Sequence, residues 1–255
     1  VRSMPTIPGI IVLKGDKKYG KYKEKYLYKC IPDDRRLPEF ILPYKLTLGF
    51  GKNIDNKYIV FKFDNWNSKH PQGTIVSVLG DVSELEHFYE YQLYCKSLYA
   101  SIQQFNKATT ASLKKQTENE IIENIIKKKN LIDKTNEYVF SIDSKDTTDY
   151  DDAFSIKKIS DNSYNLTIYI SNVPLWMEEL GLWKSFSDRI STIYLPDRKR
   201  PMLPTILSEC LCSLCENTIR LAFALEIIIM DGEIIGYSFN NVYVKLKKNH
   251  VYDSN

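Results

Sequence analysis

The chain has 255 residues, of which 43% are hydrophobic and 26% charged, as in an ordinary globular protein with one large or two modest domains. Its 35 basic and 32 acidic residues nearly cancel, and the longest apolar run, 221–230, is broken by Glu226 and too short to span a bilayer. With no secretory signal recognisable at the start, we expect no membrane partner. The five cysteines, an odd number, favour a reducing intracellular compartment, the cytoplasm or nucleus.

Residues 1–82 are predicted to form a small β module. Short β-type segments, separated by Gly, Pro and Asp, favour a small barrel or sandwich; they cover residues 8–13, 26–30, 40–42, 58–63 and 73–79. Tyr, Phe and Lys exposed on such a module would form a platform for an oligonucleotide, through base stacking and phosphate contacts. The same aromatics could instead fill its interior.

Residues 83–137 are predicted to form a helical connector. Ser83 is a candidate N-cap for a first helix. A second helix is expected over residues 111–129, and the lysines at 127–129 complement the negative end of its dipole.

Residues 138–255 contain the most informative stretch, Phe140–Phe154. It holds five aspartates in ten positions, between β-type segments at 138–142 and 153–156. An acidic run alone is most often a solvated loop. Carboxylates held between two buried strands repel one another unless a cation neutralises them, which favours a divalent metal site. An EF-hand is excluded because Phe154 and Ser160 stand where that loop needs Gly and Glu.

The rest of this region alternates strands and helices. A hairpin is expected at residues 161–162, a strand at 164–170, a helix at 176–189, and a second hairpin with its turn at 231–232. Cys210, Cys212 and Cys215 lack a fourth ligand nearby, so a structural role is favoured over zinc.

Several segments together resemble the RNB exoribonuclease family, which includes RNase II, RNase R and the catalytic subunit of the exosome. SIDSKDTTDYDDA (141–153) resembles the family signature, and IYLPD (193–197), PMLP (201–204), LS (207–208), LCSL (211–214) and RLA (220–222) follow in the family's order. PDDRRLP (32–38), residues 60–66, PQG (71–73) and LGDV (79–82) resemble the family's second cold-shock-like barrel.

The resemblance implies an α+β fold: an OB or cold-shock-like RNA-binding barrel over 1–82, a helical connector over 83–137, and the first part of an RNB catalytic domain over 138–255. It implies a metal-dependent hydrolytic 3′→5′ exoribonuclease that degrades single-stranded RNA to nucleoside 5′-monophosphates. The alternative is a catalytically inactive RNA-binding protein or a structural subunit of an RNA-decay assembly.

The resemblance also implies roles for single residues. Mg²⁺ or Mn²⁺ would be held by four aspartates, and we favour the last of them for handling the attacking water; the four are Asp143, Asp149, Asp151 and Asp152. Asp146 is expected to be a bystander. Expected RNA-binding residues are Tyr194, Arg198, Arg200 and Tyr252.

Two departures from the family qualify this expectation. Asn172 stands where the family usually has Asp, which affects fine geometry rather than the metal ligands. The sequence also stops at Asn255, part-way through the family's catalytic domain, which implies a fragment or a truncated reading frame.

Overall fold

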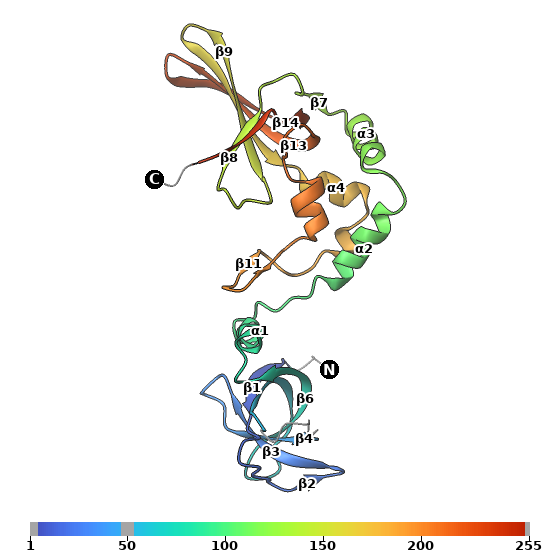
Figure 1. Cartoon of the computed structure of the whole chain (residues 1–255), viewed down its shortest axis with the longest axis vertical. Helices are drawn as coiled ribbons and strands as arrows, with labels where there is room; N and C mark the ends of the chain where they lie inside the picture. The colour runs from blue at the N-terminus through green and yellow to red at the C-terminus, as the bar shows by residue number, and fades with distance from the viewer. Residues whose placement is uncertain (1–4, 47–53, 253–255) are drawn as a thin grey trace. The chain divides into compact units, whose positions relative to one another are not determined.

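The computed structural model describes residues 5–46 and 54–252. It is divided into two compact units, each described by itself: unit 1 comprises residues 1–100 and 194–199, and unit 2 comprises residues 101–193 and 200–255 (Figure 1). The fold is α+β, as expected. No helix in the described part of the chain is both long and apolar enough to cross a membrane.

Unit 1 contains a closed five-stranded OB-like barrel. Its strands follow the order β1–β5–β6–β4–β3, and β3 returns to β1 to close the ring, while the short β2 pairs only with β3. The bounds are β1 Ile7–Ile11, β2 Lys21–Tyr22, β3 Lys25–Pro32, β4 Phe40–Tyr44, β5 Lys57–Asn65 and β6 Gln72–Asp81.

The barrel interior is filled by alternate residues of its strands. Tyr28 and Cys30 of β3 point inward with Phe61 of β5, and all three are almost fully buried. At Gly73 the strands come so close that a Cβ atom would lie 2.5 Å from the Lys62 carbonyl oxygen. Some of the aromatics therefore fill the barrel, while Tyr22 and Tyr26 stay outside it, 54% and 44% exposed.

Helix α1 (Leu85–Cys95) belongs to unit 1 and packs beside the barrel. Tyr91 stacks on Tyr58 of β5, with ring centroids 4.4 Å apart. The predicted cap is wrong: Glu84 is the N-cap and its side chain makes no capping bond, whereas the Ser83 hydroxyl donates to Asp55 instead.

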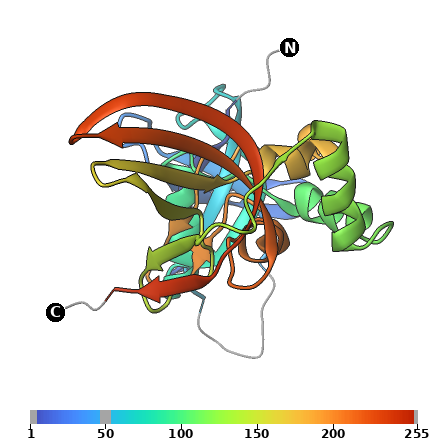
Figure 2. The same ribbon diagram turned by 90° about the horizontal axis from the view of Figure 1, so that it is seen from above.

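Unit 2 is built on a seven-stranded sheet with the order β15–β8–β9–β10–β13–β14–β7, and the paired strands β13 and β14, in red shades, curve strongly (Figure 2). The outer pairs β15–β8 and β14–β7 are parallel and the others are antiparallel. The bounds are β7 Ile132–Asp133, β8 Phe140–Asp143, β9 Asp152–Ser160, β10 Ser163–Ser171, β13 Ile219–Met230, β14 Glu233–Lys245 and β15 Lys248–Val251.

One face of this sheet carries a core of small and branched residues. Ala222 and Ala224 of β13 share this core with Val242 and Val244 of β14, and all four are fully buried. Phe223, between the two alanines, stacks on Phe239 of β14, and both side chains are exposed. This is the alternation expected of antiparallel strands with one covered face.

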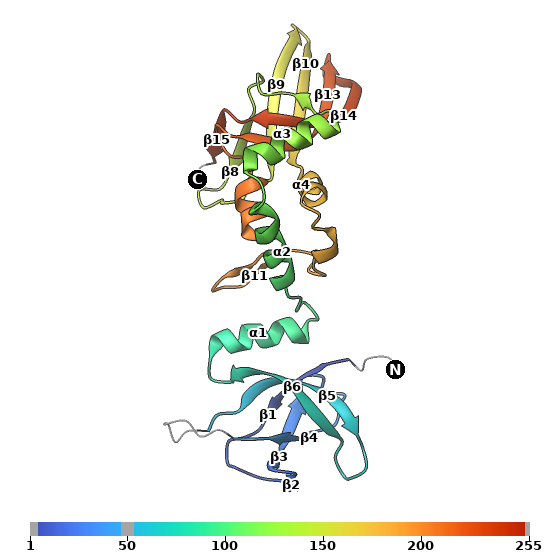
Figure 3. The ribbon, with the colours of Figure 1, turned by 90° about the vertical axis from the view of Figure 1, so that its right-hand side faces the viewer.

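Helices form a second core in unit 2 (Figure 3). They are α2 Gln103–Leu113, α3 Glu118–Lys129, α4 Val173–Glu179, a 3₁₀ turn at Trp183–Ser185 and a π-helical segment at Ile206–Leu211. The single helix predicted over 111–129 is wrong, because the chain turns between α2 and α3. The helix predicted over 176–189 is also wrong in its bounds: it begins three residues earlier and gives way to a turn at Gly181, whose φ is +65°.

The small two-stranded hairpin β11 (Ile193–Tyr194) and β12 (Lys199–Arg200) has its tip, residues 194–199, in unit 1. The division at residues 100 and 101 places α1 with the barrel and α2 and α3 with the sheet. The predicted limits of 1–82, 83–137 and 138–255 stay a prediction as domain boundaries.

Candidate functional site

The four aspartates of the signature lie on one connection in unit 2. Asp143 is the last residue of β8, Asp152 is the first of β9, and Asp149 and Asp151 lie on the loop between them. We call these four residues the signature aspartates. Asp146 lies on the same loop with its side chain exposed.

Tyr150 anchors this loop to the sheet. Its ring packs against the sheet core, its N–H donates to the Ser213 hydroxyl at 2.9 Å, and its carbonyl accepts from the Leu214 N–H at 2.9 Å. The Ser171 N–H donates to the Asp151 carbonyl at 2.8 Å. These bonds hold residues 150 and 151 against the end of β10 and the segment at 213–214.

A buried arginine supports the segment that receives Tyr150. Arg220 on β13 is 7% exposed, and its Nε donates to the Ser213 carbonyl at 2.8 Å. Its Nη1 donates to Glu118 at 2.7 Å and so pairs its charge with the first residue of α3. A buried charge needs such a partner, and here the pair fixes Ser213 in place.

Asp143 is held by its own strand and by β15. The Ser141 hydroxyl donates to Asp143 Oδ2 at 2.6 Å, and the Tyr252 N–H donates to the Asp143 carbonyl at 3.0 Å. Figure 1 shows β15 beside β8 at this edge of the sheet, in agreement with their parallel register.

The signature aspartates influence one another electrostatically. Partial loss of solvent raises the pKa of Asp151, and the negative charges of the other three raise it further. Both causes act in the same direction, so Asp151 holds a proton more readily than an isolated aspartate does. The chemistry of these four carboxylates suits a divalent cation such as Mg²⁺, which prefers hard oxygen donors.

The geometry is looser than that of a formed metal site. Within residues 5–46 and 54–252, no group of three or more His, Cys, Asp or Glu side chains converges tightly enough to hold a metal ion. Among these described residues, the cysteines at 210, 212 and 215 therefore form no metal-holding group. Cys212 is buried, whereas Cys210 is exposed.

The four predicted RNA-binding residues are divided between the two units. Tyr252 and Arg200 are in unit 2, and the structure brings the backbone of Tyr252 next to Asp143, with the side chain 55% exposed. Tyr194 and Arg198 are in unit 1. Tyr194 is 76% exposed, while Arg198 forms ion pairs with Asp197 and with Glu86 of α1. Their roles stay predictions.

Asn172, the departure from the family pattern, is buried. Its Nδ2 donates to Asn241 Oδ1 of β14 at 2.8 Å, and its N–H donates to the Leu221 carbonyl. A hydrogen bond between two amide side chains therefore joins the residue that follows β10 to β14.

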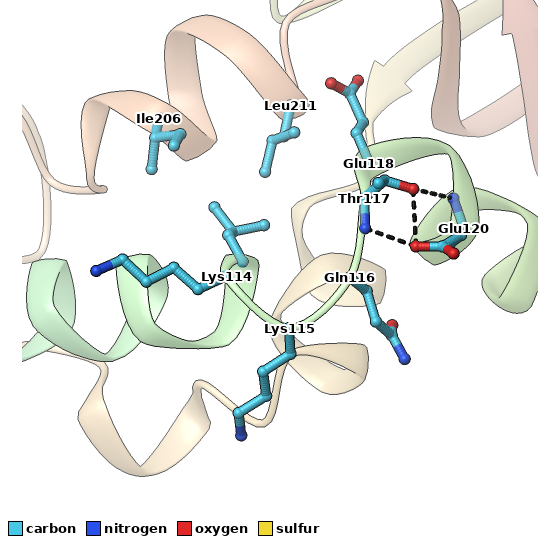
Figure 4. Close-up of a pocket in the computed structure, with 9 residues that line it drawn as sticks. Lys114, Lys115, Gln116, Thr117, Glu118, Glu120, Ile206 and Leu211 are labelled. Atoms are coloured by element: carbon cyan, nitrogen blue, oxygen red, sulfur yellow. Dashed lines mark hydrogen bonds between the residues drawn. The ribbon is translucent and has the colours of Figure 1, made fainter.

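A pocket of about 500 Å³ lies beside the turn between α2 and α3 (Figure 4). Lys114, Lys115 and Thr117 line it together with Ile206 and Leu211. None of the predicted site residues is among those that line it.

Two family models match the chain. The RNB domain model matches residues 129–254, and the Dis3-like cold-shock domain 2 model matches residues 27–90. The chain belongs to the RNB family. The signature aspartates fall within the first match. Strands β4, β5 and β6 and most of β3 fall within the second, while β1 lies before it.

The chain is similar to proteins named as ribonucleases and to one named as an inactive exonuclease. It is 33% identical to Ribonuclease R of Thermotoga maritima over 50% of this chain and 19% of that protein. It is 28% identical to the Inactive exonuclease DIS3L2 of Arabidopsis thaliana over 97% of this chain and 26% of that protein. The chain spans only 15% to 26% of the length of the curated relatives that it matches.

The fold is also that of a solved relative. Mycoplasma genitalium RNase R, in complex with ribose-methylated single-stranded RNA, matches with a TM-score of 0.74 over 99% of this chain and 38% of the other, at 21% identity. At that identity the likeness shows the fold.

Sequence reasoning missed the residues that hold the signature aspartates. Ser213 and Arg220 lie in segments that resemble the family, but no role was predicted for them, and Ser141 and Asn249 received none either. Ser213 is 63 residues from its hydrogen-bond partner Tyr150, and Asn249 is 108 residues from its partner Ser141. No local pattern signals such pairs.

Proposed function

We propose that this RNB chain takes part in the hydrolytic, metal-dependent 3′→5′ degradation of single-stranded RNA to nucleoside 5′-monophosphates. The observation that carries the proposal is the group of signature aspartates on one anchored loop. Loss of solvent, and then the negative charges of the other three, raise the pKa of Asp151. Its family membership and its named ribonuclease relatives support the same activity.

In this proposal the signature aspartates hold Mg²⁺ or Mn²⁺ at the scissile phosphate. When bound, the divalent cation would activate water and neutralise charge on the phosphate. The chain's own residues do the rest: Asp152 accepts a hydrogen bond from the attacking water and orients it, and Tyr252, beside Asp143, stacks on the terminal base. Stacking tolerates any base, as a degradative exonuclease requires.

Basic and aromatic residues would bind the RNA strand. Arg200 and Arg198 are proposed phosphate contacts, and Tyr194 is a second stacking residue. Arg198 would have to exchange its ion pairs with Asp197 and Glu86 for a phosphate. We also propose an intracellular, reducing location, which suits the free thiols of all five cysteines, and association with subunits of an RNA-decay complex.

The test is hydrolysis of a 3′-tailed single-stranded RNA in Mg²⁺ by the full chain. We expect a ladder of shortened products from the unchanged chain and none from Asp151→Asn. Asp146→Asn, which removes the same charge from the same loop outside the proposed ligand set, is the matched control and should retain the ladder. RNA binding without hydrolysis, at protein excess, would contradict catalysis by this chain.

A second candidate is RNA binding without catalysis. It is favoured by the loose geometry of the carboxylates, by the inactive relative and by the aromatic and basic surface around β2. There the Lys18 Nζ lies 4.5 Å from the centre of the exposed Tyr26 ring. If this surface binds RNA, Tyr26→Ala should weaken binding of a labelled oligonucleotide in EDTA by about 1–3 kcal/mol, whereas Tyr26→Phe should not.

A further inference from the structure

We propose that Asn249 and Ser141 are positioning residues for Asp143. A two-step hydrogen-bond relay starts on β15, passes through the Ser141 hydroxyl and ends on one carboxylate oxygen of Asp143. The consequence for cation binding rests on the proposed function, but the relay itself does not.

The relay lies at the edge of the sheet in unit 2. Asn249 Nδ2 donates to Ser141 Oγ at 2.8 Å, and Ser141 Oγ donates to Asp143 Oδ2 at 2.6 Å. Ser141 is fully buried, so water does not compete for its hydroxyl. The parallel pairing of β15 with β8 places Asn249 directly opposite Ser141.

Backbone groups fix which way the Asn249 amide faces. Its Oδ1 accepts from the Glu216 N–H at 2.9 Å, and its Nδ2 donates to the Leu214 carbonyl at 3.0 Å. A backbone N–H can only donate and a carbonyl can only accept, so the amide cannot be turned over without losing both bonds. The nitrogen must therefore be the atom that faces Ser141.

This orientation sets the direction of the hydroxyl proton. Since Ser141 Oγ already accepts from Asn249, its single proton is free for Asp143, whose carboxylate can only accept. The bond is short, as hydrogen bonds from hydroxyls to carboxylates are. It restricts the rotamer of Asp143 and uses one lone pair of Oδ2, which leaves Oδ1 and the second lone pair of Oδ2 for a cation.

Such support matters because partners of metal ligands control affinity. Losing one typically lowers metal affinity by about 10–100-fold. The relay cannot be predicted from a local sequence pattern, since Asn249 and Ser141 are 108 residues apart.

Two substitutions break the relay at different steps. Ser141→Ala removes the donor to Asp143 directly. Asn249→Asp keeps the size of the side chain and the acceptor for the Glu216 N–H, but replaces the donor by an oxygen. The new carboxylate would draw the Ser141 proton toward itself and away from Asp143, although Ser141 is unchanged.

Ser155→Ala is the matched control. Ser155 is also a buried serine of this sheet, 4% exposed, and its hydroxyl donates to a carboxylate, that of Glu137, at 3.2 Å. Its removal tests the general cost of losing a buried serine–carboxylate bond without touching Asp143.

The first measurement is the side-chain rotamer of Asp143, from NMR three-bond couplings of its carboxyl carbon to the backbone, in the absence of metal. We expect one rotamer in the unchanged chain and in Ser155→Ala, and averaged couplings in Ser141→Ala and Asn249→Asp. The second is a Mn²⁺ titration followed by electron paramagnetic resonance, in which the two relay variants should bind about 10-fold more weakly.

Distinct outcomes separate the relay from the proposed function. A single Asp143 rotamer in both relay variants, or averaging in the unchanged chain, overturns the relay. If the couplings behave as expected but the unchanged chain does not bind Mn²⁺, the relay stands and the proposed metal site fails. If Mn²⁺ binds equally tightly to all four proteins, the relay does not support cation binding, and that part of the inference is wrong.

Discussion

Glu137, just before β8, is the centre of a second buried polar network in unit 2. Its Oε2 accepts from the Tyr169 phenol at 2.7 Å and from Ser155, and its Oε1 pairs with Lys134 at 2.9 Å. Burial acts to raise the pKa of Glu137, but the hydrogen bonds from Tyr169 and Lys134 outweigh it and leave the pKa below its ordinary value of 4.5. The network therefore stabilises the ionised carboxylate.

This shift predicts a pH dependence of stability. Because the pKa is lower in the folded state, the contribution is complete above about pH 4.5 and is lost as the pH falls through the folded-state pKa. Glu137→Gln should cost about 1–3 kcal/mol at neutral pH, and the difference from the unchanged chain should shrink below pH 4.5. Urea unfolding between pH 3.5 and 7 measures it.

Tyr169→Phe provides the graded comparison. It removes one donor to Glu137 and keeps the ion pair with Lys134, so it should reduce the acid-dependent part without abolishing it. Parallel stability curves for Glu137→Gln and the unchanged chain would contradict the assignment.

For single residues, the sequence indicated the aspartates of the candidate site but not the residues that orient them. The spacing of Asp143, Asp149, Asp151 and Asp152 is local and readable. The orientation of Asp143 depends on Asn249, which becomes its neighbour only through the pairing of β15 with β8. No periodicity in the sequence encodes a contact of that kind.

Among the elements, helix α3 has a start signal that is readable in the sequence. Thr117 and Glu120 form a capping box: the Glu120 N–H donates to the Thr117 hydroxyl, and the Thr117 N–H donates to the Glu120 carboxylate at 2.8 Å (Figure 4). A Thr followed three residues later by Glu marks a helix start. This is the physical reason that the single helix predicted over 111–129 is two helices.

The cap gives a prediction for unit 2. Thr117→Ala should lower the free energy of unfolding of unit 2 by about 1 kcal/mol, because it removes the hydroxyl that accepts from the Glu120 N–H in the first turn of α3. Thr117→Ser keeps the hydroxyl and should change stability much less. Chemical denaturation followed by circular dichroism compares them, and equal stability of the Ala and Ser variants would rule out a contribution from the cap.

The strands were predicted better than the helices. Apolar β-type segments bounded by turn residues predicted the β13–β14 hairpin, with its turn at Asp231 and Gly232, and the main strands of the barrel. This local pattern could not reveal that β3 returns to β1, since closure of the barrel depends on pairing between separate segments.

For the molecule as a whole, the two units have separate cores. The barrel core is made by strands of unit 1, and the sheet and helical cores are made by residues of unit 2. Substitutions in one core should therefore act on the unfolding of that unit.

Gly73→Ala tests this separation. The added Cβ would lie 2.5 Å from the Lys62 carbonyl oxygen and 2.9 Å from Leu42 Cδ2, so we expect the barrel to lose about 1–3 kcal/mol. Scanning calorimetry should show a lower unfolding temperature for the barrel and an unchanged transition for unit 2, while Thr117→Ala should do the reverse. Both transitions moving together in either variant would contradict independent cores.

The parallel pairing of β15 with β8 has a consequence for how the protein is made. During synthesis, residues 140–152 leave the ribosome about a hundred residues before Asn249 and Tyr252 can reach them. Until then Asp143 has neither its relay nor the backbone bond from Tyr252, and β8 has an open edge. The acidic loop is therefore completed late: its carboxylates emerge from the ribosome well before the bonds that orient Asp143 can form.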